Sequence, residues 1–305
     1  MSTDILQTIQ HLQFQNKEQA EVLLLTFLRD IYEPSIRSVE LRPSALSLNS
    51  FNGYLQLGNG TRQFFKSHSE SDTIINEYYN TGLLIDAGYP IIQPVFGSTE
   101  VGKQLLVYNI VDSPSVFDVS WQIENGNEVL ANRLQSVQEQ SDKELLTIYL
   151  NTVQPQSAGD AAKSPIHQLF YHRLTGGRLQ RFYGHNRVNT GWLTKIEGTT
   201  RSIDDIWNKQ WEINGQKYDD SLNSVIQRAI KILSPVQSDI SVIGHGDAHN
   251  GNVFLNYGHN NDSMTYFDPA FAGRHSPLLD LAKPLFHNVF AMWMYFPDIM
   301  RNVFK

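Results

Sequence analysis

The sequence predicts an α+β protein with two lobes, a small β-rich lobe followed by a mostly helical one. Three observations lead to this prediction. A chain of 305 residues with 41% hydrophobic content can bury a large core, most naturally in two parts. Short strand patterns are concentrated before residue 112. Helical periodicity dominates the rest, apart from one late pair of strands.

The first elements are predicted to be helices and then strands. Apolar residues recur at helical spacing from Ile5 to Tyr32, which indicates one or two leading helices. A three-stranded antiparallel meander follows, with strands at residues 45–48, 54–57 and 62–67. The turns between them are placed at Asn52-Gly53 and at residues 58–60, because Asn and Gly accept the backbone conformations of tight turns.

One helix and two more strands complete this region. Ser71 or Asp72 caps the helix, which ends near Gly88. The strands at residues 91–96 and 104–111 then give the order βββαββ in a five-stranded sheet.

The boundary between the lobes is predicted near residues 108–115, so that the lobes are residues 1–112 and 113–305. The second lobe is expected to hold a helix at residues 145–153 and a polar linker at residues 154–163.

Two later helical stretches are also predicted. Residues 219–221 cap a helix that Ser234-Pro235 stops. The apolar stretch at residues 285–304 is interpreted as a buried pair of helices.

The composition excludes several classes of protein. Asp and Glu number 31 against 24 Lys and Arg, and the net charge of -7 provides no general attraction to nucleic acid or anionic membranes. The absence of cysteine excludes disulfides and thiolate sites and fits a reducing compartment. The sequence has no secretory signal pattern and no apolar run near the roughly 20 residues of a membrane span. We therefore expect a cytoplasmic protein without nucleic-acid or membrane partners.

The most informative segments are residues 245–256, HGDAHNGNVFLN, and residues 264–270, MTYFDPA. Each contains a strand, and antiparallel pairing of the two would set Asn252 beside Asp268. An amide oxygen and a carboxylate are ligands that Mg²⁺ prefers. Asp247 enters the hairpin from five residues earlier, where it can accept a proton from a substrate hydroxyl or orient that hydroxyl.

The spacing His245-x-Asp247-x-x-x-x-Asn252, with Asp268 further on, resembles the catalytic loop and metal-binding acid of protein-kinase-like phosphotransferases. The full string of residues 245–252 is more similar to the aminoglycoside phosphotransferase and choline kinase branch. So is Asp280-Leu281-Ala282. The resemblance spans about residues 45–285.

The resemblance implies a protein-kinase-like two-lobed fold, in which a five-stranded antiparallel N-lobe with one helix precedes a helical C-lobe that carries a catalytic hairpin. It also implies ATP and Mg²⁺ as cofactors and a small molecule with a hydroxyl group as acceptor. Asp247 is then the catalytic carboxylate, and Asn252 and Asp268 are the metal ligands. His245 and Asp280 support the loop.

The resemblance also assigns residues in the first lobe. Lys66 ends the third strand and Glu77 lies on the next helix, where such kinases hold an ion pair that positions the α- and β-phosphates. Ser50 and Asn52 belong to the segment that replaces the glycine-rich phosphate loop. This segment departs from the protein-kinase pattern because it has one glycine.

The exit of the fifth strand, Tyr108, Asn109 and Ile110, corresponds to the hinge at which backbone groups meet the adenine. A second departure is Asp268-Pro269-Ala270 in place of Asp-Phe-Gly, which argues against a protein-kinase type of switch.

Other interpretations of the histidines stay open at this stage. The pattern His245-x-Asp247-x-His249 also supplies ligand types for the Zn²⁺ site of a hydrolase. In the kinase-like interpretation, His249 supports the loop or contacts the phosphates. Residues 164–187, rich in Arg and His, are either a solvated helical face, an anion-binding wall of the acceptor site or an RNA contact.

The predicted activity is that of a small-molecule kinase that uses an alcohol group as acceptor. The alternative is a catalytically silent nucleotide-binding or scaffold protein on the same fold. Protein-kinase activity is disfavoured because Asp-Phe-Gly and Ala-Pro-Glu segments are missing. Sugars, amino alcohols and other hydroxylated metabolites remain open as acceptors, whereas the Arg/His segment argues against a polycationic aminoglycoside.

Overall fold

The fold is given by a computed structural model, which describes residues 5–43, 50–68, 73–176, 179, 194–196, 199–201, 206–236, 238–258 and 261–303. The chain forms two compact units. The first comprises Met1–Thr152, Ile243–Gly273 and Pro277–Lys305, and the second comprises Val153–Val242 and Arg274–Ser276. None of the helices in the described ranges combines the length and apolar character needed to cross a membrane. The predicted division at residues 108–115 separates functional lobes and stays a prediction.

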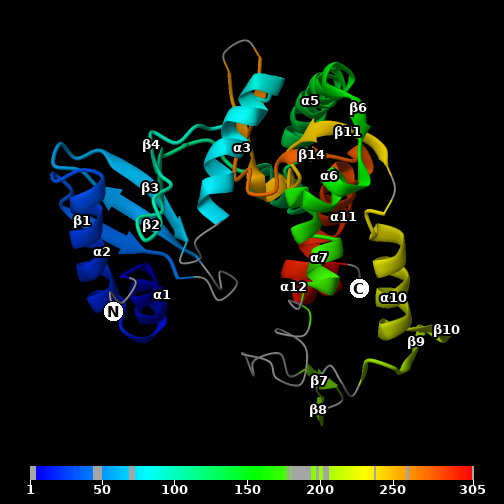
Figure 1. Cartoon of the computed structure of the whole chain (residues 1–305). Coiled ribbons are helices and arrows are strands. Elements are labelled where there is room, and N and C mark those ends of the chain that lie inside the picture. The colour runs from blue at the N-terminus through cyan, green and yellow to red at the C-terminus, as the bar shows by residue number, and fades with distance from the viewer. Residues whose placement is uncertain are drawn as a thin grey trace. The chain divides into compact units, whose positions relative to one another are not determined.

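The first unit begins with α1 (Ile5–Gln15) and α2 (Lys17–Ile31), the two predicted leading helices. An antiparallel sheet follows, hydrogen-bonded in the order β1-β2-β3-β5-β4, with α3 inserted after the third strand (Figure 1). Its elements are β1 (Ser38–Leu41), β2 (Ser50–Gln56), β3 (Arg62–His68), α3 (Thr73–Ala87), β4 (Phe96–Ser98) and β5 (Leu105–Asn109). The predicted α+β class, the five-stranded antiparallel sheet and the order βββαββ are therefore confirmed.

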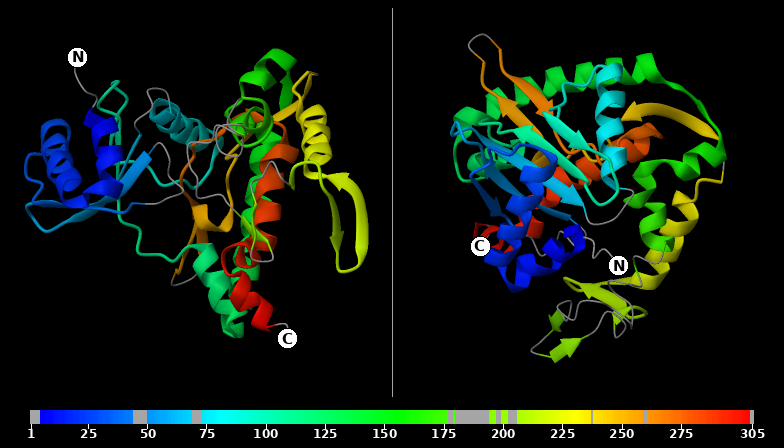
Figure 2. Two further views of the ribbon diagram at one scale, coloured as in Figure 1. Left: turned by 90° about the horizontal axis from the view of Figure 1, so that it is seen from below. Right: turned by 60° about the vertical axis from the view of Figure 1, so that its left-hand side comes forward.

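Alternating side chains give this sheet two different faces. Phe65 on β3 and Leu105 and Val107 on β5 are buried in one cluster with the apolar residues of α1 and α2. The two helices lie beside the sheet (Figure 2). Because successive side chains of a strand point to opposite faces, Phe64 and Tyr108 face the other way. They form a separate small cluster. The leading helices thus cover one face and leave the other to the candidate site.

The predicted turn at Asn52-Gly53 is wrong, because both residues lie inside β2. A Cβ atom on Gly53 would come within 2.0 Å of the carbonyl oxygen of Glu40, so this glycine allows β1 to approach β2 closely. Gly53 therefore allows two strands to lie close together and does not form a turn. The strand predicted at residues 45–48 lies outside the described residues.

The rest of the first unit is mostly helical and carries the predicted hairpin. Its elements are α4 (Val116–Glu124), α5 (Glu128–Thr152), η3 (Asn250–Asn252), β12 (Val253–Asn256), β13 (Ser263–Tyr266), α11 (Pro277–Tyr295) and α12 (Pro297–Val303). β12 and β13 pair antiparallel, with Val253 opposite Tyr266, as predicted. Leu84, Val119 and Leu255 belong to one buried cluster that joins α3, α4 and the hairpin.

The second unit contains small elements. They are β6 (Gln154–Gln156), α6 (Ala158–Lys163), η1 (Pro165–Gln168), α7 (Tyr171–Thr175), β7 (Thr194–Ile196), β8 (Thr199–Arg201), β9 (Gln210–Ile213), β10 (Gln216–Ser221) and α10 (Leu222–Leu233). β11 (Asp239–Gly244) and β14 (Gly273–His275) each have residues in both units. The predicted helix after residue 221 is α10, in which Ser221 and Ser224 form a reciprocal capping box.

Two predictions about the helical region are wrong. The segment at residues 154–163 is not a linker, because it forms β6 and α6. The stretch at residues 285–304 does form a helical pair, but it is not buried. Leu285 and Phe286 on α11 are 64% and 58% exposed, whereas the buried residues of this helix include Asp280 and His287. The packing side of α11 is thus partly polar, which an assignment based on apolar content misses.

Candidate active site

Asn252 and Asp268 lie at the open end of the β12-β13 hairpin. The backbone N–H of Phe267 donates to the carbonyl oxygen of Asn252 at 2.9 Å, which extends the strand pairing to the residue before Asp268. The side-chain nitrogen of Asn252 donates to the carbonyl oxygen of Asp247 at 3.0 Å, so its amide oxygen faces away from that loop. An amide oxygen and a carboxylate at one hairpin end fit the donor set that Mg²⁺ takes in proteins.

Asp268 has a strained backbone and a charged partner. Its φ of 59° lies in the left-handed region, which a residue other than glycine occupies at a cost of about 1–3 kcal/mol. The ammonium group of Lys66 lies 2.7 Å from its carboxylate. Burial is the largest influence on the pKa of Asp268 and would raise it, but the charge and the hydrogen bond of Lys66, together with His68 and His245, hold that pKa below its ordinary value. The carboxylate is therefore ionised at neutral pH.

The register of the sheet places the other first-lobe residues near Lys66. Lys66 shares its face of β3 with Phe64, two residues earlier. Asn52 on β2 lies directly opposite Lys66, and Ser50 lies opposite His68, so both predicted residues are on the Lys66 face. The side chain of Glu77, the predicted partner of Lys66, lies outside the described residues.

A cavity of about 200 Å³ lies on the same face of the sheet. It is lined by Tyr54, Phe64, Ile92, Tyr108, Asn109, Ile110, Val111, Phe254 and Phe267. These residues include the predicted hinge residues Tyr108, Asn109 and Ile110. Phe267 connects the cavity to the hairpin, because its ring lies 5.1 Å from that of Tyr108 and the next residue is Asp268. Mostly apolar walls with a few polar groups are typical of ligand pockets and suit a flat ring such as a purine.

The loop before the hairpin is held by His245, which is fully buried. The backbone N–H of Asp247 donates to Nδ1 of His245 at 3.3 Å, so the ring proton is on Nε2, which donates to the carbonyl oxygen of Phe267 at 3.0 Å. Because both ring nitrogens bond to the backbone, His245 is a structural residue. This arrangement does not support the alternative zinc site.

Gly246 and Asp280 fix the path of the loop. Gly246 has a φ of +80°, and a Cβ atom there would come within 2.4 Å of the carbonyl oxygen of Phe271. The Gly246 N–H donates to the carboxylate of Asp280 at 2.5 Å, and the hydroxyl of Tyr149 donates to the same carboxylate. Burial, and then the Asp280 charge, raise the pKa of Tyr149, so its hydroxyl stays protonated and can donate. Asp280 thus braces the loop from α11.

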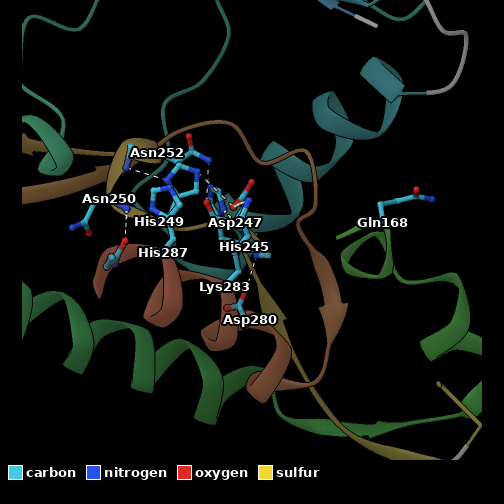
Figure 3. Close-up of polar contacts among 12 residues, drawn as sticks. Gln168, His245, Asp247, His249, Asn250, Asn252, Asp280, Lys283 and His287 are labelled. Atoms are coloured by element: carbon cyan, nitrogen blue, oxygen red, sulfur yellow. Dashed lines mark hydrogen bonds and ion pairs between the residues drawn. The ribbon is translucent and has the colours of Figure 1, made fainter. Parts of the chain in front are cut away.

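Helix α11 continues this contact along the loop (Figure 3). The Lys283 ammonium group forms an ion pair with the carboxylate of Asp247, and the His287 ring lies 4.2 Å from the His249 ring. One residue further on, the side-chain oxygen of Asn288 accepts a hydrogen bond of 2.8 Å from the N–H of residue 250. The loop is therefore bonded to α11 along most of its length.

Lys283 and His287 were missed by the sequence analysis, although a signal for them was present. Asp280, Lys283 and His287 are spaced by three and four residues, so they lie on one side of a helix whose other residues are mostly apolar. Because Asp280 was already assigned to the site, polar residues on its side of the helix could have been predicted to face the site as well.

His249 lies against the Asp247 carboxylate. Its Nδ1 accepts the Gly251 N–H at 3.1 Å, and its Nε2 lies 3.7 Å from the carboxylate of Asp247. Burial, followed by the charges of His287 and Lys283, lowers the pKa of His249 to about 3. The ring is therefore neutral at physiological pH and adds no charge beside Asp247.

The structure describes the first half of the Arg/His segment at residues 164–187. Most of residues 177–187, the second half of the Arg/His segment, lie outside the described residues. In the first half, the ring of His172 bonds to the carbonyl oxygen of Ala162 at 2.8 Å, and burial lowers the pKa of His167. Across the described ranges, no three His, Asp or Glu side chains are grouped as a metal site.

Residues 158–292 match the model of the ecdysteroid kinase-like family. Solved structures similar to this chain include an aminoglycoside phosphotransferase in complex with ADP and hygromycin B, with a TM-score of 0.47, 12% identity and coverage of 87% of this chain and 76% of that chain. Another is the ethanolamine kinase of Plasmodium vivax, with a TM-score of 0.41, 14% identity and coverage of 92% and 72%. No curated protein matches the chain. The matched family is kinase-like, which confirms the predicted resemblance to kinase-like phosphotransferases.

Proposed function

We propose that this protein transfers the γ-phosphate of ATP to a hydroxyl group of a small molecule. The observation that carries the proposal is the pairing of two carboxylates with two ammonium groups beside an apolar cavity. Asp268 is paired with Lys66, and Asp247 is paired with Lys283. The cavity at the exit of β5 suits the adenine, and Phe267 in its wall directly precedes Asp268 in the chain.

The nucleotide would be held by the first-lobe residues. The aromatic walls of the cavity bind the purine, and Lys66 moves from Asp268 to the phosphates when nucleotide is present. Ser50 and Asn52 lie on the same face of β2 and can donate to phosphate oxygens. A Mg²⁺ ion held by Asn252 and Asp268 would neutralise the charge of the phosphates.

Asp247 would act on the acceptor. Its carboxylate accepts the proton of the attacking hydroxyl, or orients that hydroxyl toward the γ-phosphate. His245 fixes the backbone of residue 247, and Asp280 fixes the residue before it. Much of the catalysis would come from position and charge, because phosphoryl transfer leaves the protein little covalent chemistry to perform.

The acceptor is expected to be a small hydroxylated molecule. The similar structures include proteins named for aminoglycosides and ethanolamine, and both kinds of molecule carry hydroxyl groups. The acidic net charge of -7 gives no reason to expect a nucleic-acid acceptor. The presence of all three predicted acidic and amide groups at one site disfavours the silent alternative.

The test is an ATP-consumption screen against a library of small alcohols in the presence of Mg²⁺. Asp247→Asn is the matched blank, because it keeps the shape of the side chain and removes the charge. We expect acceptor-dependent ADP formation by the wild type and its loss in the variant, with nucleotide binding retained. Equal ADP formation by both proteins would contradict the role of Asp247. Slow acceptor-independent hydrolysis as the only activity would support the silent alternative.

A further inference from the structure

Lys283 reaches the candidate catalytic carboxylate from α11, the helix on which the resemblance assigns a role to Asp280 but none to Lys283. Its ammonium group forms an ion pair with Asp247, and the side chains of Lys283 and Asp247 are 29% and 11% exposed. An ammonium group and a carboxylate with so little solvent between them attract each other more strongly than an exposed surface pair.

The helix that carries Lys283 is fixed against the loop on both sides of the ion pair. Asp280 bonds to the N–H of Gly246, and Asn288 bonds to the N–H of Asn250. Lys283 lies between these two residues in the sequence, and it shares one side of α11 with Asp280 and His287 (Figure 3). The distance from the helix to Asp247 is therefore set by backbone contacts, so a lysine side chain at this position is held close to the carboxylate.

The contacts of Asp247 divide into two kinds. Its N–H donates to His245 and its carbonyl oxygen accepts from Asn252, and these bonds fix the backbone of the residue. Lys283 forms an ion pair with the carboxylate itself, and the neutral ring of His249 lies 3.7 Å from it. Lys283 is thus a charged group that can fix the direction of the carboxylate oxygens. A proton acceptor must be held within hydrogen-bond reach of the hydroxyl, and an error of about 1 Å in position can lower the rate by on the order of 10²-fold.

We propose that Lys283 is a positioning residue for phosphoryl transfer, which holds the carboxylate of Asp247 in the orientation that receives the acceptor hydroxyl. This inference rests on the proposed function and extends it to a residue outside the recognised motif. Lys283 would act through Asp247, whereas Lys66 would act on the nucleotide. The two lysines thus serve different steps, and their substitutions should separate binding from turnover.

The main experiment compares Lys283→Met, Lys283→Arg and Lys103→Met in the ATP-consumption assay. Methionine keeps the length of the side chain and removes its charge. We expect Lys283→Met to lower kcat by roughly 10- to 100-fold without changing the Kd for ATP in the absence of acceptor. Lys283→Arg should recover part of the lost kcat. Lys103 forms an exposed ion pair with Glu100, and neither residue is assigned to the site, so Lys103→Met should match the wild type.

A double-mutant cycle then separates positioning from direct action on the phosphate. If Lys283 acts through Asp247, Lys283→Met should have little further effect in an Asp247→Asn background, measured by single turnover with enzyme in excess. An additional loss as large as in the wild-type background would overturn the inference, because Lys283 would then act independently of Asp247. Thermal melts of each variant identify any loss that is due to unfolding.

The outcomes also separate this inference from the proposed function. If the wild type consumes no ATP with any acceptor, the proposed function fails and the role of Lys283 falls with it. If the wild type is active, Asp247→Asn is inactive and Lys283→Met keeps full kcat, the proposed function stands and only the role of Lys283 is overturned.

Discussion

The two ammonium–carboxylate pairs of the site differ in which partner is shielded from solvent. In the pair from β3 to the hairpin, the Lys66 side chain is 12% exposed and the Asp268 side chain is 32% exposed. In the pair from α11 to the loop the order is reversed, because Lys283 is the more exposed partner. Asp268 thus has room for further ligands, whereas Asp247 is enclosed by its supports. The more exposed carboxylate of Asp268 is therefore suited to bind a further cation, and the enclosed carboxylate of Asp247 is suited to keep one orientation.

Removing the charge of Asp268 should have the largest effect on turnover. Asp268→Asn keeps the shape of the side chain but takes away the charge that would bind Mg²⁺, which contributes several kcal/mol to phosphoryl transfer. We expect turnover to fall by about 10³-fold or more, together with a weaker dependence on Mg²⁺ concentration. Initial rates over a Mg²⁺ titration measure both. Unaltered Mg²⁺ dependence would show that Asp268 is not a ligand.

Lys66→Met should break the first pair while leaving the second intact. Since charged hydrogen bonds to phosphate contribute about 1.5–3 kcal/mol, the Kd for ATP should rise by roughly 10- to 100-fold. Calorimetric titration with a non-hydrolysable ATP analogue measures this change. Lys283→Met is the matched control, because it should leave the same Kd unchanged. A similar loss of affinity in both variants would remove the distinction between the pairs.

Asp280→Asn tests the support beneath the second pair. The carboxylate accepts hydrogen bonds from Gly246 and Tyr149 in a buried position, and an amide can replace at most part of this arrangement. The free energy of unfolding should fall by about 1–3 kcal/mol, measured by denaturant unfolding. Ser113→Ala, which removes a partly buried hydrogen bond to Asn256, provides a smaller change for comparison. Stability equal to that of the wild type would show that Asp280 does not brace the loop.

The effect that is smallest at neutral pH concerns His249, which lies beside the second pair and gains charge only in acid. Because its pKa is lowered to about 3 in the folded state, the unfolded chain binds more protons below the ordinary pKa of about 6.5. Its contribution to stability is present above that pH and is lost as the pH falls toward 3, by up to about 1.4 kcal/mol per pH unit. His249→Gln should therefore flatten the stability profile between pH 6 and about 4. Parallel wild-type and variant profiles would contradict the assignment.

Much of the candidate site could be predicted from local patterns. Asp247, Asn252 and Asp268 belong to one hairpin and the loop before it. The register of that hairpin follows from two short strands and a turn. Lys66 was assigned by the resemblance, and the alternation of β3 then sets it on the same face of the sheet as Phe64. Residues that meet through short segments of chain can be inferred from sequence, because strand pairing and side-chain alternation are regular.

The predictions that failed concern segments whose local pattern is ambiguous, because a distant part of the chain decides their structure. Asn52-Gly53 is typical of a turn, but the approach of β1 made Gly53 a strand residue. The apolar content of α11 indicated burial on all sides, yet the helix buries Asp280 and His287 and exposes Leu285. Neither outcome follows from propensity, because each depends on what packs against the segment.

Local sequence patterns were enough to predict the class of fold, the order of the elements around the sheet and the hairpin that carries Asn252 and Asp268. The contact of Lys283 with Asp247, and the choice of which face of α11 is covered, arise only when the chain packs. Backbone periodicity is encoded locally, whereas the pairing of two charges more than 30 residues apart depends on how helices and loops pack once the chain has folded.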